Sequence, residues 1–238
     1  MSSQSRPSSL PRESPWKSVR WRGLFYSGVL AVREVLRPVL YWHAWHIFST
    51  DLGGELPEQY AREQVDIKIF ADGAAIETVL MQLAPMGRLS EEQIRTRLER
   101  GGAVAIACVG GEPAGYMWLT FTNGWELAYG VTWILRPDEA LRYGSYVVPK
   151  WRGLGIHSSL NYALNSYARS RGLRRTLGSI GAFNRQSLNL AKHAGRPKTM
   201  TVFVLHINGV NWTYVRAFGA PLDSRFSRPL GKKVAVRS

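Results

Sequence analysis

A predicted strand that runs through a glycine-containing turn into a long helix is the feature that most constrains the fold. The apolar stretch 141–148 ends at Pro149, and Arg-Gly-Leu-Gly-Ile follows at 152–156. Apolar residues then recur at helical spacing over 156–167, and Gly172 closes the helix. A strand that feeds directly into a helix is typical of a domain that mixes α and β elements.

The turn is expected to place free backbone N–H groups at the positive end of that helix. Gly153 and Gly155 allow a tight bend and a close approach of the backbone to a ligand. Lys150 and Arg152 add positive charge. The turn therefore predicts a site for a phosphate group, while two glycines also occur in turns that bind nothing.

Hydrophobic periodicity predicts further elements on both sides of this turn. The predicted strands are 65–70, 103–109, 114–121, 175–180, 201–207 and 210–215, and the predicted helices lie around 73–84, 90–101 and 184–195. Asp72 is a candidate N-cap, Ser90 and Gln93 form a capping box, and Gly110-Gly111 and Asn208-Gly209 turn two hairpins. This order of elements predicts a mixed α/β sheet.

Length and composition favour one main domain in a chain of 238 residues. The formal charge of +14 is spread along the chain and favours anionic ligands, but no nucleic-acid motif accompanies it, so we expect no specific nucleic-acid partner. The single cysteine, Cys108, lies in a predicted buried strand and cannot form a disulfide within the chain. A reducing compartment fits, and we expect the cytoplasm, with the inner face of the membrane as a second location.

The first 64 residues differ in composition from the rest. Residues 1–18 are rich in Ser, Pro and Arg, which is typical of a disordered tail. The apolar run 24–32 is too short to span a bilayer, which takes about 20 residues. We expect an N-terminal extension over 1–64, a main domain over 65–218 and a basic C-terminal tail over 219–238.

An aromatic and histidine cluster occupies residues 41–48 of this extension. Two interpretations stay open: a helix or strand that packs on the main domain, or a peripheral membrane contact through residues 19–48. His43 and His46 have helical spacing, but no third ligand is near in the sequence, so we expect no metal site.

The segment from Val147 to His157 resembles the central motif of the GNAT (GCN5-related) N-acetyltransferases. In that family Val-x-Pro is followed by Arg-Gly-x-Gly-Ile and a helix, and here the segment is Val-Val-Pro-Lys-Trp-Arg-Gly-Leu-Gly-Ile-His. His157 stands where the family usually has Gly or Ala. Asn184 to Ser187 is similar to a second family motif, Asn-x-x-Ser/Ala. The resemblance covers roughly residues 65–218 and implies a GNAT-like acyl-CoA N-acyltransferase fold with an N-terminal extension.

The resemblance also implies a cofactor, acetyl-CoA or another acyl-CoA. Its pantetheine arm would lie along the strand end at Val147, and the amides of residues 153–158 would hold its pyrophosphate. The implied cofactor-binding residues are Val147, Val148, Arg152, Gly153, Leu154, Gly155, Ile156, His157, Ser158, Asn184 and Ser187.

The residues for proton transfer are less well marked. Many relatives carry a tyrosine as general acid where this chain has Ala191, and His193 or Tyr162 are replacements by proximity in sequence. Glu139 and Tyr143 are candidate general bases, because strand alternation can place both on one face before the turn. The structural alternatives are an exposed glutamate at a strand end and a tyrosine packed in the sheet.

Two functions stay open at this stage. The first is the transfer of an acetyl group from acetyl-CoA to an amine, or a hydroxyl, of an unidentified acceptor such as a cell-surface saccharide precursor. The second is a catalytically inactive GNAT-like domain that binds an acyl-CoA or a polyanionic partner, which the missing tyrosine and His157 favour. Residues 121–136, with Trp125 and Trp133, are expected on the acceptor side.

Overall fold

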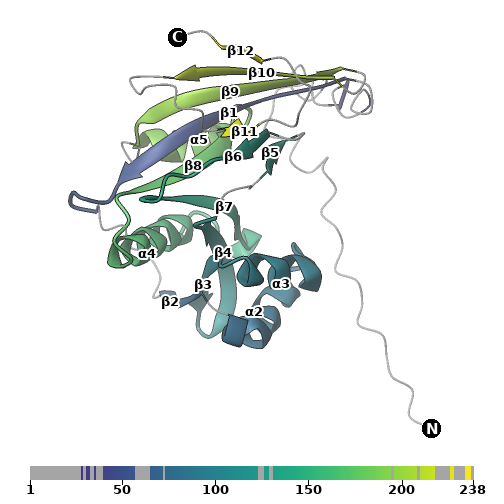
Figure 1. The fold of residues 1–238 in the computed structure, drawn as a ribbon. Coiled ribbons are helices and arrows are strands. Elements are labelled where there is room, and N and C mark those ends of the chain that lie inside the picture. The colour runs from purple at the N-terminus through teal and green to yellow at the C-terminus, as the bar shows by residue number, and fades with distance from the viewer. Residues whose placement is uncertain are drawn as a thin grey trace.

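The computed structural model is described here for residues 40–56, 65–71, 73–122, 126–128, 131–193, 196–207 and 210–217, with isolated residues before 40 and two short strands after 217. The strands of its main sheet are β1 (Leu40–Asp51), β2 (Val65–Phe70), β3 (Ala103–Val109), β4 (Glu112–Thr120), β7 (Glu139–Val147), β8 (Arg175–Gly181), β9 (Lys198–Ile207), β10 (Val210–Ala217) and β12 (Val234–Val236). They form one nine-stranded sheet in the order β12-β10-β9-β1-β8-β7-β4-β3-β2 (Figure 1). The pairs β7–β8 and β10–β12 are parallel and the other pairs are antiparallel.

The remaining elements are helices and a small second sheet. The helices are α2 (Ile76–Leu83), α3 (Glu91–Glu99), α4 (Ile156–Ser170) and α5 (Arg185–His193), with 3₁₀ turns η2 (Gly73–Ala75), η3 (Ala84–Met86) and η4 (Pro149–Trp151). The small sheet has the order β11-β6-β5, from Phe226–Ser227, Val131–Trp133 and Glu126–Ala128. The predicted mixed α/β fold is confirmed.

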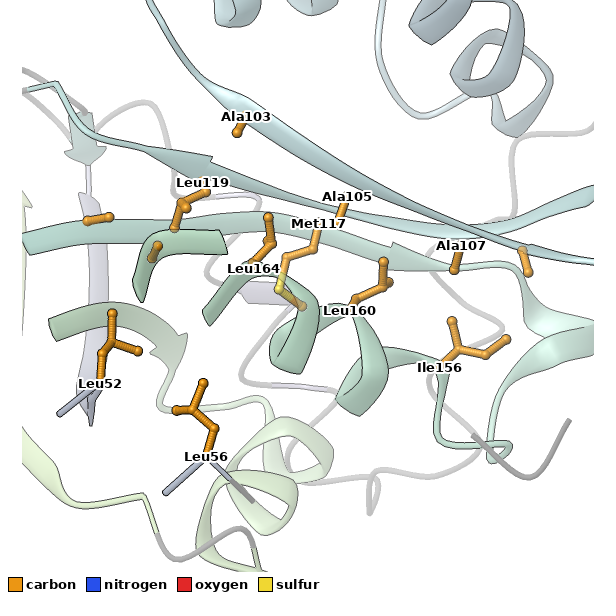
Figure 2. Close-up of a cluster of buried hydrophobic side chains, with 13 residues drawn as sticks. Leu52, Leu56, Ala103, Ala105, Ala107, Met117, Leu119, Ile156, Leu160 and Leu164 are labelled. Atoms are coloured by element: carbon orange, nitrogen blue, oxygen red, sulfur yellow. The ribbon is translucent and has the colours of Figure 1, made fainter. Parts of the chain in front are cut away.

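Successive residues of a strand point to opposite faces of a sheet. The β2–β3–β4 part of the sheet has apolar side chains on both faces, and helices cover both of them. Helix α4 packs Leu160 and Leu164 toward Ala105 and Met117 on one face (Figure 2). On the other face, α2 and α3 cover a cluster that includes the buried Trp118. The face under α4 is built largely from small alanines, so the helix can approach the strands closely.

Local signals predicted the ends of several elements correctly. Ser90 Oγ accepts a hydrogen bond from the Gln93 N–H at 3.2 Å, and the Gln93 side chain accepts from the Ser90 N–H at 3.0 Å. The predicted capping box of α3 is therefore present. The predicted cap Asp72 and the turn Asn208-Gly209 lie outside the described residues.

Strand β1 corrects the predicted N-terminal extension. It lies between β8 and β9 in the sheet, with Ile47 paired to Ser179 on one side and to Met200 on the other. Ile47 and Phe48 are buried. The aromatic cluster is thus a strand of the main sheet, and the expectation of a separate extension is wrong for residues 40–51. Short strands β11 and β12 likewise fall within the predicted C-terminal tail.

The strand conformation also separates the two histidines, because strand residues three apart point to opposite faces. His46 Nδ1 lies 2.9 Å from Thr201 Oγ1, whereas the His43 ring packs against Trp45. No three metal-ligating side chains gather among the described residues. Within the same part of the chain, no helix is long and apolar enough to cross a membrane.

Candidate functional site

The glycine turn, residues 152–158, connects β7 to α4 through two left-handed glycines. Gly153 and Gly155 both have φ of +85°, a conformation that favours glycine. The N–H groups of Ser158 and Ser159 donate to the Gly155 carbonyl at 2.9 and 3.1 Å, which begins the helical bonding of α4. Within the described residues, the amides of 153–157 have no backbone acceptor. They are available to an anion at the positive end of a 15-residue helix.

The space beside the turn is open, and the two cations there, Lys150 and Arg152, differ in how free they are to bind a phosphate. A Cβ added at Gly153 would meet no atom within 4 Å. Arg152 is exposed and donates from Nε to the Val147 carbonyl at 3.1 Å, which ties the turn to the strand end. Lys150 instead forms an ion pair with Glu112 at 2.6 Å. Arg152 thus keeps donors free for a phosphate, whereas part of the Lys150 charge is neutralised.

Strands β7 and β8 pair in parallel over only four positions, Glu139–Arg142 with Arg175–Gly178. Beyond Arg142 and Gly178 no further pair joins them. A bulge follows in β7 at Gly144, where φ is +54° and the register with β4 shifts. The two strands therefore diverge toward the glycine turn.

A cavity of about 170 Å³ lies where these strands diverge, bordered also by α4 and α5. The predicted site residues His157, Ser158, Asn184, Ser187 and Tyr143 line it. The buried residue Ala191, at the position of the missing tyrosine, lines it as well. The predicted residues Val147, Val148, Arg152, Gly153, Leu154, Gly155 and Ile156 are not among its lining and belong to the strand end and the turn.

Two of these predicted cofactor residues have structural roles in the chain itself. The Ile156 side chain is 1% exposed and packs in the core under α4, so only its backbone can serve a ligand. Asn184 Oδ1 accepts from the Ser187 N–H at 3.1 Å and thereby caps α5.

His157 turns away from the glycine turn toward Asn161, and it is held neutral. Asn161 Oδ1 accepts from Arg142 Nη1, so the Asn161 amide donates to His157 Nδ1 at 3.0 Å. The proton of the neutral ring then lies on Nε2. Burial, with the charges of Arg196 and Arg142, lowers the pKa of His157 to about 4. The side chain is a fixed hydrogen-bond donor at neutral pH.

Arg142 is a buried cation beside this network, and sequence analysis missed it. It is 5% exposed, donates from Nη1 to Asn161 at 2.5 Å and from Nη2 to Thr50 at 3.1 Å, and leaves Nε without a partner. Burial lowers the pKa of Arg142 to about 9, with a smaller effect from Arg196, so the guanidinium keeps its charge at neutral pH. An arginine directly after the apolar residues Ala140 and Leu141 in a predicted strand was the available signal.

Arg196 lines the cavity close to Arg142 and was also missed. Burial lowers its pKa, and no carboxylate of the described residues acts against that effect. None of the described residues that line the cavity is Asp or Glu. The cavity is therefore cationic, with two arginines and a neutral histidine.

The predicted bases do not meet in this cavity. Glu139 is 2% exposed, accepts from the Arg136 N–H at 3.3 Å and lies 3.8 Å from Arg175. It is not among the cavity lining. Its position, where β7 and β8 are still paired, does not support the role of general base.

Tyr143 borders the cavity, but its ring packs on the opposite face of the sheet. The ring stacks on Trp118 at 6.4 Å between centroids and lies under the Arg97 guanidinium at 5.1 Å. Burial raises the pKa of Tyr143 to about 12, which makes it a poor base. Val147 packs on the α4 face instead. Tyr143 and Val147 therefore lie on opposite faces, because the Gly144 bulge adds a residue between them.

The other candidate positions are placed as follows. Tyr162 is half-buried, packs against the core under α4 and does not line the cavity. The side chains of His193 and Trp133, and all of Trp125, lie outside the described residues. Their expected roles stay predictions.

Comparison with known proteins gives one extended match. The model of the acetyltransferase (GNAT) family matches residues 74–195, just over half of the chain. A search of curated proteins found no match.

Several solved structures are similar to this chain at low identity. The GCN5-related N-acetyltransferase from Sphaerobacter thermophilus is 18% identical, with a TM-score of 0.47, over 75% of this chain and 55% of that one. A functionally unknown conserved protein from Staphylococcus epidermidis is 12% identical, with a TM-score of 0.46, over 75% and 67%. The aminoglycoside N-acetyltransferase AAC(6')-Iy in complex with CoA is 16% identical, with a TM-score of 0.42, over 59% and 91%.

The chain therefore spans just over half the length of the Sphaerobacter protein. The region matched by the family model contains the glycine turn, the diverging strands β7 and β8, and most of the residues that line the cavity. Because that model matches more than half of the sequence, this chain belongs to the GNAT acetyltransferase family.

Proposed function

We propose that this protein transfers an acetyl group, or a related short acyl group, from an acyl-CoA to an amine or a hydroxyl of an acceptor. The observation that carries this proposal is the glycine turn at the start of α4, which adjoins a cavity between two diverging strands within the family match. When bound, the cofactor would supply a thioester, whose acyl carbon is the electrophile.

The residues present fit the anionic part of such a cofactor. The free amides of 153–157 and the positive end of α4 suit a pyrophosphate. Both left-handed glycines keep side chains out of the approach, and exposed Arg152 adds a cation. The side chain of His157, which stands where the family usually has Gly or Ala, bonds to Asn161.

The cavity residues can stabilise negative charge but supply no evident base. His157 offers its Nε2–H as a donor to charge that develops in the reaction, and its low pKa excludes it as a proton donor at neutral pH. No carboxylate lies among the described residues of the lining. Catalysis then depends on positioning and hydrogen bonding, with the acceptor's proton passing to water or to a group outside these residues.

The acceptor and the location belong to the same proposal. Arginines and aromatics early in the sequence support work beside the inner face of a membrane, in the cytoplasm, on a cell-surface saccharide precursor. Because β1 takes residues 40–51 into the sheet, only residues 19–39 remain for that contact. Turnover on membrane-bound but not on soluble amino sugars would support this acceptor class, and the reverse would count against it.

Calorimetry with acetyl-CoA on three chains tests the cofactor site. Gly155→Glu puts a carboxylate at the turn and should weaken binding at least about tenfold, since it repels the pyrophosphate and fills the approach. Gly172→Glu is the matched control, because Gly172 also has a positive φ, of +78°, but lies at the other end of α4. Equal binding by parent and Gly155→Glu would exclude the turn as the cofactor site.

Binding of an acyl-CoA without turnover is the second candidate. It is favoured by Ala191, which is buried at the cavity wall where many relatives carry a catalytic tyrosine, and by the neutral state of His157. Steady release of free CoA with any amine or hydroxyl acceptor would eliminate this candidate.

A further inference from the structure

The cavity holds two arginines, and none of the described residues that line it is acidic. Arg142 is 5% exposed and Arg196 is half-buried. The charge of Arg196 lowers the pKa of Arg142, and the charges of both arginines lower the pKa of His157. Buried cations in proteins are normally paired, because an unpaired charge away from water is costly. A pair of arginines without a carboxylate is therefore an unusual feature that calls for an anion from outside the chain.

Arg142 has hydrogen-bonding capacity left over for that anion. A guanidinium carries five N–H donors, and this one uses one on Nη1 and one on Nη2. Its Nε is buried without a partner. The guanidinium lines the cavity, and together with Arg196 on the same cavity wall its remaining N–H groups can donate to the two oxygens of a carboxylate.

The position of Arg142 marks the inner end of the cavity. It occupies the last position at which β7 pairs with β8, so the strands diverge from this point toward the glycine turn. A Cβ at Gly178, its partner on β8, would lie 3.8 Å from Arg142 Nη2, so the guanidinium lies over that glycine. Ser158, at the end of the turn, lines the same cavity. A ligand held at the turn and entering the cavity would point its far end at Arg142.

The size of the cavity selects the molecule that brings the anion. Sites for independent small molecules typically measure 300–1,000 Å³, roughly twice this cavity or more. A volume of about 170 Å³ suits the end of one extended ligand. The anion is then part of the same molecule whose phosphates occupy the turn.

We propose that the inner end of the cavity binds a carboxylate at the far end of the acyl group, so that the preferred donor is the CoA thioester of a dicarboxylic acid. This inference rests on the proposed acyl-CoA function and narrows its acyl group. The transfer itself is unchanged: the C–S bond breaks, a C–N bond forms to the acceptor amine, and the proton lost by the amine ends on the CoA thiol. The product is an amide that carries a free carboxylate.

A different use of the same arginines makes an opposite prediction. If Arg142 and Arg196 served only to polarise the thioester carbonyl, neutral and acidic acyl groups of equal size would bind alike. Discrimination between a carboxylate and its uncharged amide therefore separates the two roles.

The test measures binding of two stable thioether analogues by calorimetry, with no turnover required. S-(3-carboxypropyl)-CoA carries the carboxylate, and S-(3-carbamoylpropyl)-CoA has the same shape without the charge. We expect the parent protein to bind the carboxylate analogue about tenfold tighter or more, which is the scale of one charge-assisted bidentate contact. Arg196→Gln should reduce that ratio to about threefold or less, while CoA itself binds as before.

Controls separate charge at the cavity from charge elsewhere and from misfolding. Lys192→Gln removes a cation from an exposed position on α5 and should keep the parental ratio. Arg142→Gln should also lose the preference for the carboxylate analogue. Because Arg142 also holds Asn161 and Thr50, its replacement can disturb the fold, so Arg196→Gln is the decisive variant.

Three results would overturn the inference. Equal affinity of the parent for both analogues refutes it and leaves the proposed CoA site intact. Failure of CoA and both analogues to bind removes the proposed function and this inference together. A parental preference that persists in both arginine variants would also refute it, because the recognition would then lie elsewhere.

Discussion

A single histidine shows how the local network sets chemical behaviour at the residue scale. His157 accepts from Asn161 at Nδ1, and Asn161 is oriented by Arg142. Protonating Nδ1 would break this bond and bring a third positive charge next to Arg142 and Arg196. The ring is therefore neutral because of its surroundings, and the same surroundings predict how stability changes with pH.

The free energy of unfolding should depend on His157 between its two pKa values. The ordinary pKa of 6.5 falls to about 4 in the folded chain, so the unfolded chain binds more protons in this window. The stabilisation that comes from the neutral ring is complete above pH 6.5 and is lost as the pH falls toward 4. On going from about pH 7 to about pH 4.5 in urea denaturation, the parent should lose up to about 2 kcal/mol more than His157→Gln.

His46 provides the control for that experiment, because burial also lowers its pKa. His46→Gln should leave the His157 contribution in place and change the pH dependence separately. Parallel pH profiles of the parent and His157→Gln would contradict the neutral, buried state of His157.

Sequence analysis found the backbone features of the site better than its charges. Gly153 and Gly155 were identifiable because a positive φ at a tight turn almost requires glycine. This requirement depends only on the local backbone conformation, so it is visible in the local sequence. Arg142 and Arg196 were missed because their burial without an acidic partner depends on which strands and helices surround them. The ion pair of Glu139 with Arg175 was not predicted, because it comes from the parallel pairing of β7 with β8.

At the element scale, strand β1 is central to stability although it precedes the recognisable motif. Its residues pair with β8 and β9 over most of its length, and those partners lie well over 100 residues later in the chain. No local pattern in the sequence encodes such distant pairing, so the aromatic cluster gave no sign of its neighbours. Strands and helices with clear periodicity, such as β3 and α4, were predicted closely because local spacing is sufficient for them.

Truncating a buried side chain on β1 should therefore destabilise the whole domain. Ile47 is fully buried among Leu141, Leu177 and Val202. Ile47→Ala should lower the free energy of unfolding by about 2–5 kcal/mol, as large-to-small changes in cores do. Chemical denaturation followed by circular dichroism measures this loss.

The matched control is Met81→Ala, at a side chain that is 70% exposed, which should change stability by about 0.5 kcal/mol or less. If residues before Val65 were a peripheral extension, Ile47→Ala would be as mild as Met81→Ala. By the same reasoning, removal of residues 1–64 should abolish folding, so that deletion cannot be used to test membrane contact.

At the scale of the whole molecule, positive charge and the site act together. The chain carries a net charge of +14, and part of it lies in the cavity, at Arg142 and Arg196, and at the glycine turn, at Arg152. This arrangement attracts an anionic cofactor and disfavours the empty protein, because like charges are brought together away from water. Groups kept for binding at the expense of stability are common at functional sites.

The cations repel one another in the empty cavity but attract an anionic ligand. We therefore predict that removing one cation stabilises the empty protein and weakens ligand binding. Arg196 is half-buried, no carboxylate in the described part of the chain acts on it, and its charge opposes that of Arg142. Arg196→Gln should raise the free energy of unfolding without ligand by roughly 1 kcal/mol, a typical gain when a functional residue in conflict with folding is replaced. Thermal or urea denaturation without CoA measures it, and Lys192→Gln, exposed on α5, should change stability little. If Arg196→Gln destabilises the empty protein instead, the arginine serves the fold, and its place in the cavity follows from packing and not from a ligand.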